Sequence, residues 1–399
     1  MVKGSPKKVI VGLSGGVDSA VTAAILKNNG HEVVAVHFRL IDKDNKKNLD
    51  DVKKICRKLD MPLKIIDVRK KFKSEVIDYF VGEYGKGRTP NPCVMCNPGI
   101  KFKLLLGEMA RMRADYVATG HYARVKILED RQVRVCNSNR IVNSRYKTSK
   151  LCEAGCKPAP ATNKNSTPFF QLLESKDKTK DQSYFLYRLT QKELSRAIFP
   201  LGEYSKAEVR KLAKKFNLPV AEKEESQDVC FIPSEGVEKY LQKNIKMKSG
   251  MIVDKNGKTI GRHKGLPLYT FGQRKGLEIG GTGPYYVIDK DKKKNIIKVT
   301  GCANDPGFST PKMTLEKVSW IVAEPKLPLR ALIATRYRKK PGYGIIRKVK
   351  SQKSNVKSLG GGAFAYEVNF EKPERMVTSG QSAVFYSDKG EVLGGGIIA

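Results

Sequence analysis

The sequence predicts an α/β fold, a doubly wound parallel sheet followed by two small β-rich domains. Three observations lead to this prediction. An apolar run at 9–11 meets a glycine turn and an apolar-periodic segment at 17–26, which is a strand–turn–helix pattern. Strands and helices then alternate as far as residue 119, as a parallel sheet requires. From residue 249 onward, short β-branched and aromatic runs alternate with turns, which is typical of compact β domains and barrels.

The other elements follow from periodicity and length. In the first half we expect strands at 32–38, 63–68 and 116–119, and helices at 48–59, 72–84, 100–111 and 205–217. Ser205 and Glu208 have the spacing of a capping box at the start of the last helix. The segment 86–97 holds two prolines and a C-x-x-C pair, and we expect an irregular loop there. In the second half we expect strands at 285–289 and 296–300, and near 318–323, 331–338, 365–370 and 383–386.

Length sets the number of domains. A chain of 399 residues is long for a single core. We expect a catalytic domain at 1–245, a central β-rich domain at 246–305 and a C-terminal barrel-like domain at 306–399. Within the first domain, residues from about 129 to 178 are rich in polar and basic residues and poor in apolar periodicity, so they form an expected insertion.

The charge balance predicts a polyanionic partner. The net charge is +36, from 76 Lys and Arg against 40 Asp and Glu, and nucleic acid is the leading candidate. A generally basic composition is the alternative. No apolar run reaches transmembrane length and the N-terminus does not resemble a signal peptide, so we expect a cytoplasmic protein without membrane contact. In that reducing compartment, cysteines are more often catalytic, metal-binding or buried than disulfide-bonded.

The glycine turn has the features of a phosphate site. Gly15 and Gly16 allow close approach of the backbone to a ligand, and the amides up to Asp18 lie at a helix N-terminus. Ser14 and Ser19 add hydroxyl donors. Asp18 suits an anion site only if it holds Mg²⁺ that accompanies the phosphates, and otherwise it caps an ordinary turn. The S-G-G-x-D-S pattern is neither a Walker A loop nor a G-x-G-x-x-G fingerprint. It resembles the PP-loop of ATP enzymes that cleave between the α- and β-phosphates and leave AMP on the substrate.

Three cysteines are candidates for catalysis or metal binding. Cys93 and Cys96 form the C-x-x-C pair near the expected ligand end of the sheet, and Cys230 lies in a later loop. Three interpretations are open. Cys93 and Cys96 could be a redox or persulfide pair, or all three cysteines could hold an iron–sulfur cluster with one open iron. The C-x-x-C pair could also be a structural zinc site or inert. Cys136, Cys152 and Cys156 lack a fourth partner, and we expect no metal there. Cys56 and Cys302 lie in apolar-patterned segments, and we expect both in the core.

Further polar residues are candidates for nucleic-acid contact. His121 follows a buried strand at the edge that carries the glycine turn, where it could contact phosphate or a base, or serve a structural role. The stretch Lys180-Asp181-Gln182 could contact phosphates and base edges. Arg336 and Tyr337 combine a cation with an aromatic ring, which suits backbone neutralisation with base stacking, although a solvated basic turn has the same composition.

Taken together, these motifs resemble the tRNA-specific 2-thiouridylase family, which replaces O2 of the wobble uridine by sulfur. The matching segments occur in family order over nearly the whole chain: 12–19, 87–92, 96–97 with 100–102, 118–124, 180–186, 199–202, 225–228 with 230–232, 269–274 and 380–386.

The resemblance assigns roles to individual residues. It implies that ATP contacts Gly12, Leu13, Ser14, Gly15, Gly16, Val17, Asp18, Ser19, Phe38 and Gly120. It implies that Cys96 is the first catalytic cysteine and that Cys230 is its partner and persulfide carrier. Asn91, Pro92 and Cys93 are implied to face the target base. His121, Lys180, Asp181, Gln182, Arg336, Tyr337 and Gln381 are implied to face the anticodon stem-loop of tRNA. A sulfur donor, either a persulfide carrier protein or inorganic sulfide, is a further expected partner.

The sequence departs from the family pattern at two places. Many members have Asp at the position of Cys93, so an acid–base role cannot be carried over. Three thiols at one site instead resemble cluster-dependent tRNA thiolases, and this favours a [4Fe-4S] cluster on Cys93, Cys96 and Cys230 over a metal-free persulfide relay. The second departure is the long segment near 129–178. Two other function classes are compatible with parts of the sequence: a PP-loop ligase or amidotransferase acting on a small molecule, and a non-catalytic RNA-binding protein.

Overall fold

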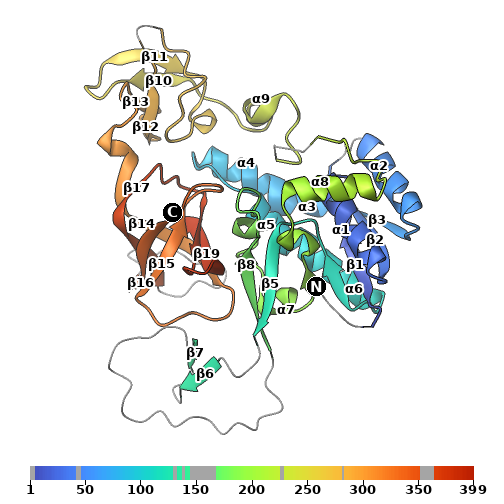
Figure 1. The fold of residues 1–399 in the computed structure, drawn as a ribbon. Helices are drawn as coiled ribbons and strands as arrows, with labels where there is room; N and C mark the ends of the chain where they lie inside the picture. The colour runs from blue at the N-terminus through green and yellow to red at the C-terminus, as the bar shows by residue number, and fades with distance from the viewer. Residues whose placement is uncertain are drawn as a thin grey trace.

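A computed structural model describes residues 5–41, 46–128, 133–136, 140–143, 168–224, 229–280, 283–350 and 364–399. Figure 1 shows an α/β unit in blue and green, a barrel in orange and red, and a small sheet set apart from both. No helix in these ranges is long and apolar enough to cross a membrane.

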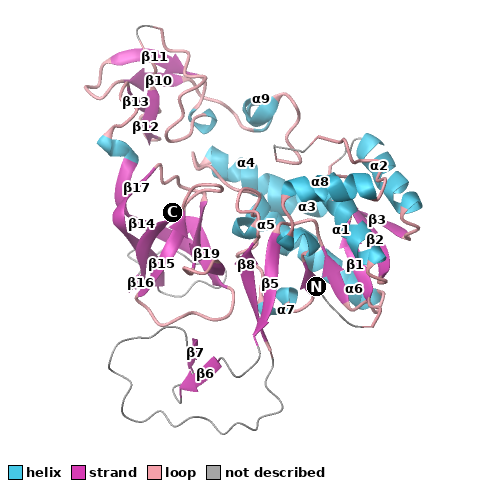
Figure 2. Cartoon of the chain, in the orientation of Figure 1, coloured by secondary structure: helices cyan, strands magenta, loops and turns pink. Residues whose placement is uncertain are grey.

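The α/β unit is built on a five-stranded sheet in the order β3-β2-β1-β4-β9, and each neighbouring pair is parallel. The strands are β1 Lys8–Gly12, β2 Glu32–Arg39, β3 Leu63–Asp67, β4 Tyr116–Ala118 and β9 Ala197–Ile198. Helices cover the sheet, which confirms the predicted doubly wound class (Figure 2). Val9, Ile10 and Val11 are fully buried because both sides of β1 are covered. Each such side chain stabilises the fold by about 1.5–3 kcal/mol.

Several helices match the predicted segments. The helix after the glycine turn is α1 Val17–Asn28, the next is α2 Lys46–Lys58, and α8 is Lys206–Lys215. Ser205 and Glu208 form the expected capping box at the start of α8. The predicted helix at 72–84 is a continuous run of α3 Arg69–Phe72, a π-helical turn Lys73–Ile77 and α4 Asp78–Gly85. Two short helices complete this part of the fold, α7 Gln191–Leu194 and α9 Gly236–Asn244.

The expectation of an irregular loop over 86–97 is wrong for its second half. A helix begins at α5 Cys93–Cys96, widens into a π-helical turn Asn97–Phe102 and continues as α6 Lys103–Arg111. Pro92 precedes the first turn, where its missing N–H costs nothing. Asn91 Oδ1 accepts a hydrogen bond from Cys93 N at 3.1 Å and so satisfies a free donor of that turn. Proline therefore starts this helix.

Two antiparallel strands lie near the two ends of the segment expected as an insertion, and they extend the sheet of the C-terminal half. These strands are β5 Ala123–Leu128 and β8 Phe169–Glu174, and β8 pairs with β19 Glu391–Ile398. Figure 1 shows β5 and β8 between the barrel and the parallel sheet. Within the segment, β6 Val133–Cys136 pairs with β7 Arg140–Asn143. Cys152 and Cys156 lie outside the described residues, as does the 225–228 motif.

The second half is entirely β-rich, as predicted. A four-stranded sheet has the order β11-β10-β13-β12, with β10 Gly250–Val253, β11 Thr259–His263, β12 Tyr286–Asp291 and β13 Ile296–Thr300. The C-terminal strands are β14 Ser309–Trp320, β15 Leu329–Ala334, β16 Gly342–Lys350, β17 Phe364–Arg375, β18 Ser382–Tyr386 and β19. They run in the order β14-β17-β16-β15-β18-β19, and β14 also pairs with β19, which closes a barrel.

The two cysteines expected in the core behave differently. Cys56 on α2 is buried, and burial raises the pKa of its thiol to about 11. Cys302 is exposed, so the expectation for it is wrong. It lies in the turn that follows β13, where the chain has left the apolar alternation of the strand.

Candidate active site

The glycine turn lies where the strand order of the parallel sheet reverses. β1 has β2 on one side and β4 on the other, and the loop after β1 is at the carboxyl edge. Such switch points are the ligand sites of open α/β sheets. Two serine hydroxyls organise the turn: Ser14 Oγ and Ser19 Oγ are 3.1 Å apart, and Ser19 Oγ donates to Gly16 O at 3.1 Å. The amides that follow begin α1, so the turn can bind an anion.

Close backbone contacts fix this turn in place. Gly15 has a φ of +81°, and a Cβ there would lie 2.8 Å from Asn48 O. A Cβ on Gly120, at the end of β4, would lie 2.8 Å from Ser19 N. Both positions therefore require glycine. Of the other residues implied to contact ATP, Phe38 is the second-last residue of strand β2, at the same edge of the sheet.

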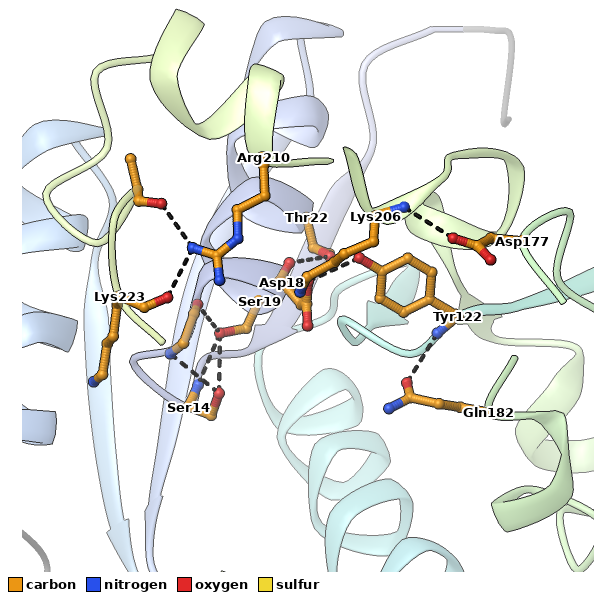
Figure 3. Close-up of polar contacts among 12 residues, drawn as sticks. Ser14, Asp18, Ser19, Thr22, Tyr122, Asp177, Gln182, Lys206, Arg210 and Lys223 are labelled. Atoms are coloured by element: carbon orange, nitrogen blue, oxygen red, sulfur yellow. Dashed lines mark hydrogen bonds and ion pairs between the residues drawn. The ribbon is translucent and has the colours of Figure 1, made fainter. Parts of the chain in front are cut away.

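Sequence reasoning missed two residues that support the turn from behind. His37 Nδ1 lies 2.8 Å from Leu13 O and is buried. Lys223 Nζ donates to Gly15 O at 3.0 Å, to Asn48 Oδ1 at 2.8 Å and to Asp51 Oδ2 at 2.7 Å. Arg210 in turn holds the backbone at 221 and 223 (Figure 3). A lone lysine or histidine carries no sequence signal for such a role.

Asp18, the candidate magnesium residue, is engaged by two side chains from elsewhere in the domain. Its Oδ1 accepts a hydrogen bond from Tyr122 Oη at 2.9 Å and one from Lys206 Nζ at 2.6 Å (Figure 3). Neither partner was identified from sequence. Its carboxylate is the type of ligand that Mg²⁺ prefers.

The two cysteines of the C-x-x-C pair lie at the N-terminus of the long helix that leads into β4. Because that helix runs antiparallel to the strands, its start lies at the same edge as the glycine turn. The ring of Phe102 stacks on His121 with centroids 6.2 Å apart, and Leu105 lies beside Gly12. Cys96 is 5% exposed. A helix N-terminus favours the thiolate form of a cysteine.

Cys230 is brought to this helix by its neighbour in the chain. Phe231 is 4% exposed and packs against Phe72 and Phe80 with centroid distances of 5.7 and 5.2 Å. It shares a buried apolar cluster with Cys96 and Ile100. The structure thus joins two motifs that are far apart in sequence, as the resemblance implied.

The charge of Lys101 interacts with all three thiols. Desolvation lowers its pKa, but the thiolates of Cys96, Cys93 and Cys230 outweigh that effect and the pKa is raised. Pro98 has no N–H to continue the α-helical ladder, and the wider π-helical turn brings residues five apart onto one face. Cys96 and Lys101 have this spacing, so the distortion places the cation beside the thiols.

Burial dominates the titration of these thiols. Desolvation raises the pKa of Cys93 and Cys96, and Lys101 partly opposes it. The Cys230 residue is exposed overall, but crowding around its thiol raises its pKa to about 12. Desolvation and Lys101 together hold the pKa of His121 well below its usual range, so its imidazole is neutral. Its Nδ1 lies 2.8 Å from Thr119 Oγ1.

The loop that precedes Cys93 is where all three parts of the fold meet. Thr89 O accepts a hydrogen bond from Gln381 Nε2 at 2.7 Å, and Thr89 N donates to Ser379 O at 2.9 Å. From the four-stranded sheet, Lys290 Nζ donates to Gly87 O at 2.7 Å. The β-rich half therefore positions the loop that leads to Cys93. Gln381 has a structural contact of its own, and its role toward tRNA stays a prediction.

The other residues predicted to face tRNA divide into two groups. Gln182 Oε1 accepts from Tyr122 N at 3.0 Å, and Asp181 accepts from Ser175 N at 2.7 Å and Ser183 Oγ at 2.6 Å, so both support the fold. Tyr337 packs on Phe185 with centroids 4.5 Å apart, and Arg336 donates to Thr378 Oγ1 at 3.3 Å. Lys180 lines an open hollow of about 580 Å³ together with Lys178, Thr179 and Arg338. This hollow is basic and suits a phosphate.

Replacing Asp181 by asparagine is expected to change the pH dependence of stability. Burial raises the pKa of Asp181 to about 6, above its ordinary value, so the folded chain binds this proton more readily than the unfolded chain. The aspartate thus favours folding more at acid pH, and this contribution is lost as pH rises through about 6. Urea unfolding across that pH range should show wild type losing stability relative to Asp181→Asn. A difference that is independent of pH would contradict this assignment.

Fold and site together define a class: a PP-loop α/β nucleotide-binding protein that carries cysteines beside its loop and a β barrel at its C-terminus. Three family models match the chain in sequence order. They are described as a tRNA methyl transferase HUP domain at residues 7–234, a tRNA methyl transferase PRC-barrel domain at 238–301 and an aminomethyltransferase beta-barrel domain at 310–398.

Relatives of full length identify the family more closely. The tRNA-specific 2-thiouridylase MnmA of Proteus mirabilis is 36% identical over 412 residues, covering 100% of this chain and 98% of the relative. The protein of the same name from a Nostoc species is 37% identical over 398 residues, and MnmA 2 of a Thermoanaerobacter species is 38% identical over 405. Both cover 98% of this chain, with 98% and 97% of the respective relatives. The chain therefore belongs to the tRNA-specific 2-thiouridylase family.

Solved structures are less similar. A 4-thiouridine synthetase–RNA complex with bound ATP has a TM-score of 0.34 at 16% identity and covers 56% of this chain and 44% of its own. NMN synthetase from Francisella tularensis has a TM-score of 0.30 at 15% identity, with 55% and 66% covered. At these scores the likeness supports no statement about this chain.

Proposed function

We propose that this chain is an ATP-dependent tRNA 2-thiouridylase that replaces O2 of the wobble uridine by sulfur. The observation that carries the proposal is the placement of a PP-loop and three cysteines at one edge of the parallel sheet, joined through Phe102, His121 and Lys101. One half of this site activates a carbonyl oxygen and the other supplies the attacking sulfur. Family membership and a net charge of +36 support tRNA as the acceptor.

The activation step uses the residues of the loop. O2 of the uridine attacks the α-phosphorus of ATP, the bond to the β-phosphate oxygen breaks, and pyrophosphate leaves. Amides and hydroxyls at the start of α1 stabilise the phosphate charge. Asp18 would hold Mg²⁺, which supplies further charge neutralisation on the phosphates. ATP and Mg²⁺ are thus the cofactors of the proposed reaction.

The sulfur step uses the cysteines. A persulfide on Cys230 attacks C2 of the adenylated base through its outer sulfur, and AMP leaves with O2. Cys96 thiolate then attacks the inner sulfur of Cys230, the S–S bond to the base breaks, and the pair is left as a disulfide that an external dithiol reduces. Lys101 stabilises the thiolate. The uridine has to leave the anticodon stack to reach this site, and Asn91, Pro92 and Cys93 line the approach.

The alternative, a [4Fe-4S] cluster, would require Cys93, Cys96 and Cys230 to be grouped closely enough to bind it together. In the described ranges, no three His, Cys, Asp or Glu side chains are grouped closely enough to hold a metal ion. This arrangement does not fit the cluster, so no step is assigned to it.

Iron analysis distinguishes the two sulfur routes. Protein purified without oxygen is expected to contain no stoichiometric iron or labile sulfide, and to thiolate tRNA fully with a persulfide donor. The reason is that the relay stores sulfur on Cys230 and needs no metal. One [4Fe-4S] cluster per chain, with activity lost when iron is removed by a chelator, would establish the cluster instead.

We further propose the division into domains at 1–245, 246–305 and 306–399, a persulfide carrier protein as the sulfur donor, and a cytoplasmic location. The function is tested by release of AMP from ATP with and without tRNA. AMP release that requires tRNA with a wobble uridine, and fails with a wobble cytidine, is the expected result. AMP release with a small-molecule acceptor and no tRNA would favour a ligase or amidotransferase.

A further inference from the structure

Lys206 is placed where its charge is unfavourable for its own helix. It is the first residue of α8, after the Ser205 cap, and a cation at a helix N-terminus opposes the macrodipole. Its side chain is only 13% exposed. Two carboxylates hold it there: Asp177 Oδ2 accepts from Lys206 N at 3.0 Å and Asp18 Oδ1 accepts from Lys206 Nζ at 2.6 Å. The charge of Lys206 is unfavourable for α8, and a carboxylate from another helix holds its ammonium group. This combination indicates that Lys206 has a role outside its own helix.

The partner of the ammonium group points to that role. Asp18 is the second residue of α1, directly after the glycine turn, and its carboxylate is the proposed ligand of Mg²⁺. Tyr122 Oη donates to the same oxygen, and the ammonium lies 5.7 Å from the centroid of the Tyr122 ring (Figure 3). The ammonium of Lys206 therefore contacts the carboxylate that would hold Mg²⁺, at the start of the helix that follows the glycine turn.

We propose that Lys206 is a catalytic residue that binds the β- and γ-phosphates of ATP and neutralises the departing pyrophosphate. Asp18 holds its ammonium at the mouth of the loop. Asp18 would also hold the Mg²⁺ that accompanies the phosphates, and the flexible four-carbon stem of Lys206 allows the ammonium to reach the phosphate oxygens. This inference rests on the proposed adenylation reaction and assigns a residue to its leaving group.

Lys223 shows by contrast what a structural lysine looks like at this loop. Its three oxygen partners are Gly15 O, Asn48 Oδ1 and Asp51 Oδ2, all behind the turn. Moving it would leave a backbone carbonyl of the turn without its donor. If the ammonium of Lys206 moves away, Asp18 loses one partner, and the Asp18 carboxylate would hold Mg²⁺ in its place.

The test compares Lys206→Met and Lys206→Arg with Lys211→Met, a control at an exposed position of the same helix. Equilibrium binding is measured with AMP and with a non-hydrolysable ATP analogue plus Mg²⁺, and pyrophosphate release is measured in a single turnover with tRNA. Lys206→Met is expected to weaken analogue binding at least tenfold and to slow pyrophosphate release about 10²- to 10³-fold. AMP binding should be unchanged because AMP lacks the phosphates that Lys206 contacts, and Lys206→Arg should recover part of both losses.

Analogue binding and pyrophosphate release at wild-type levels in Lys206→Met would overturn the inference. An equal loss of AMP and analogue binding would also overturn it, because it would show that Lys206 only shapes the site. If wild type and Lys211→Met bind the analogue but release no pyrophosphate with tRNA, the proposed function fails. The ratio of analogue to AMP binding still decides the role of Lys206 in that case.

Discussion

Alanine at Cys96 or Cys230 is expected to abolish tRNA thiolation while ATP binding and the first pyrophosphate release persist. The hydrogen bonds of the glycine turn come from Ser14, Ser19 and Lys223, so the activation half does not depend on the thiols. Cys96 is a small side chain in an apolar cluster, and loss of its sulfur costs about 1 kcal/mol of stability. The two half-reactions should therefore separate in these variants.

The measurement for the cysteine variants pairs single-turnover pyrophosphate release with mass spectrometry of the product tRNA. Cys302→Ala is the matched control because Cys302 is an exposed thiol in the turn after β13 and has no part in the proposed site. It should thiolate like wild type. Loss of nucleotide binding together with thiolation in Cys96→Ala would make that cysteine structural, and retained thiolation would remove it from the mechanism.

Alanine at Gly120 is expected to disable the activation half. Its Cβ would lie 2.8 Å from Ser19 N and 2.9 Å from the Asp18 carbonyl carbon, and both are backbone atoms of the first turn of α1. The methyl group can be accepted only if the loop or β4 moves, and a displacement of about 1 Å at a reacting site costs about 10²-fold in rate. ATP affinity and tRNA-dependent AMP release should both fall.

Gly107→Ala is the control for Gly120→Ala. Gly107 lies in α6 with open space around the position of a Cβ, so alanine should raise helix stability by up to about 1 kcal/mol and leave activity unchanged. Thermal melting of both variants shows whether each folds. A folded Gly120→Ala protein with the ATP affinity of wild type would contradict the close packing of β4 against the loop.

The sequence was a good guide wherever a pattern repeats locally. The strand–turn–helix at 8–28, the alternation up to residue 118 and the capping box of α8 each have a periodicity or spacing of their own, and all are present. The motif resemblance also anticipated that the Cys230 segment and the Cys96 helix belong to one site; Phe231 and Cys96 share an apolar cluster, and the roles of the two cysteines stay predictions. Strands β16 and β19 were missed, since glycines interrupt the alternation of both.

The remaining features depend on contacts that are distant in sequence. The helix at Cys93 was missed because proline was interpreted as a breaker, whereas its position before the first turn makes it a start. The hairpin of β5 and β8 extends the C-terminal sheet through a pairing across more than half the chain. Lys206 and Lys223 act on the loop from a helix and a segment beyond residue 200, and single lysines in a basic sequence give no sign of this.

The proposed reaction transfers sulfur to a tRNA base that ATP has activated. The most direct test incubates the purified protein with ATP, Mg²⁺, a persulfide donor and tRNA, and then analyses the nucleosides by mass spectrometry. We expect 2-thiouridine at the wobble position, formed only when ATP is present and in proportion to the AMP released. Unmodified wobble uridine, or sulfur placed at another position, would contradict it.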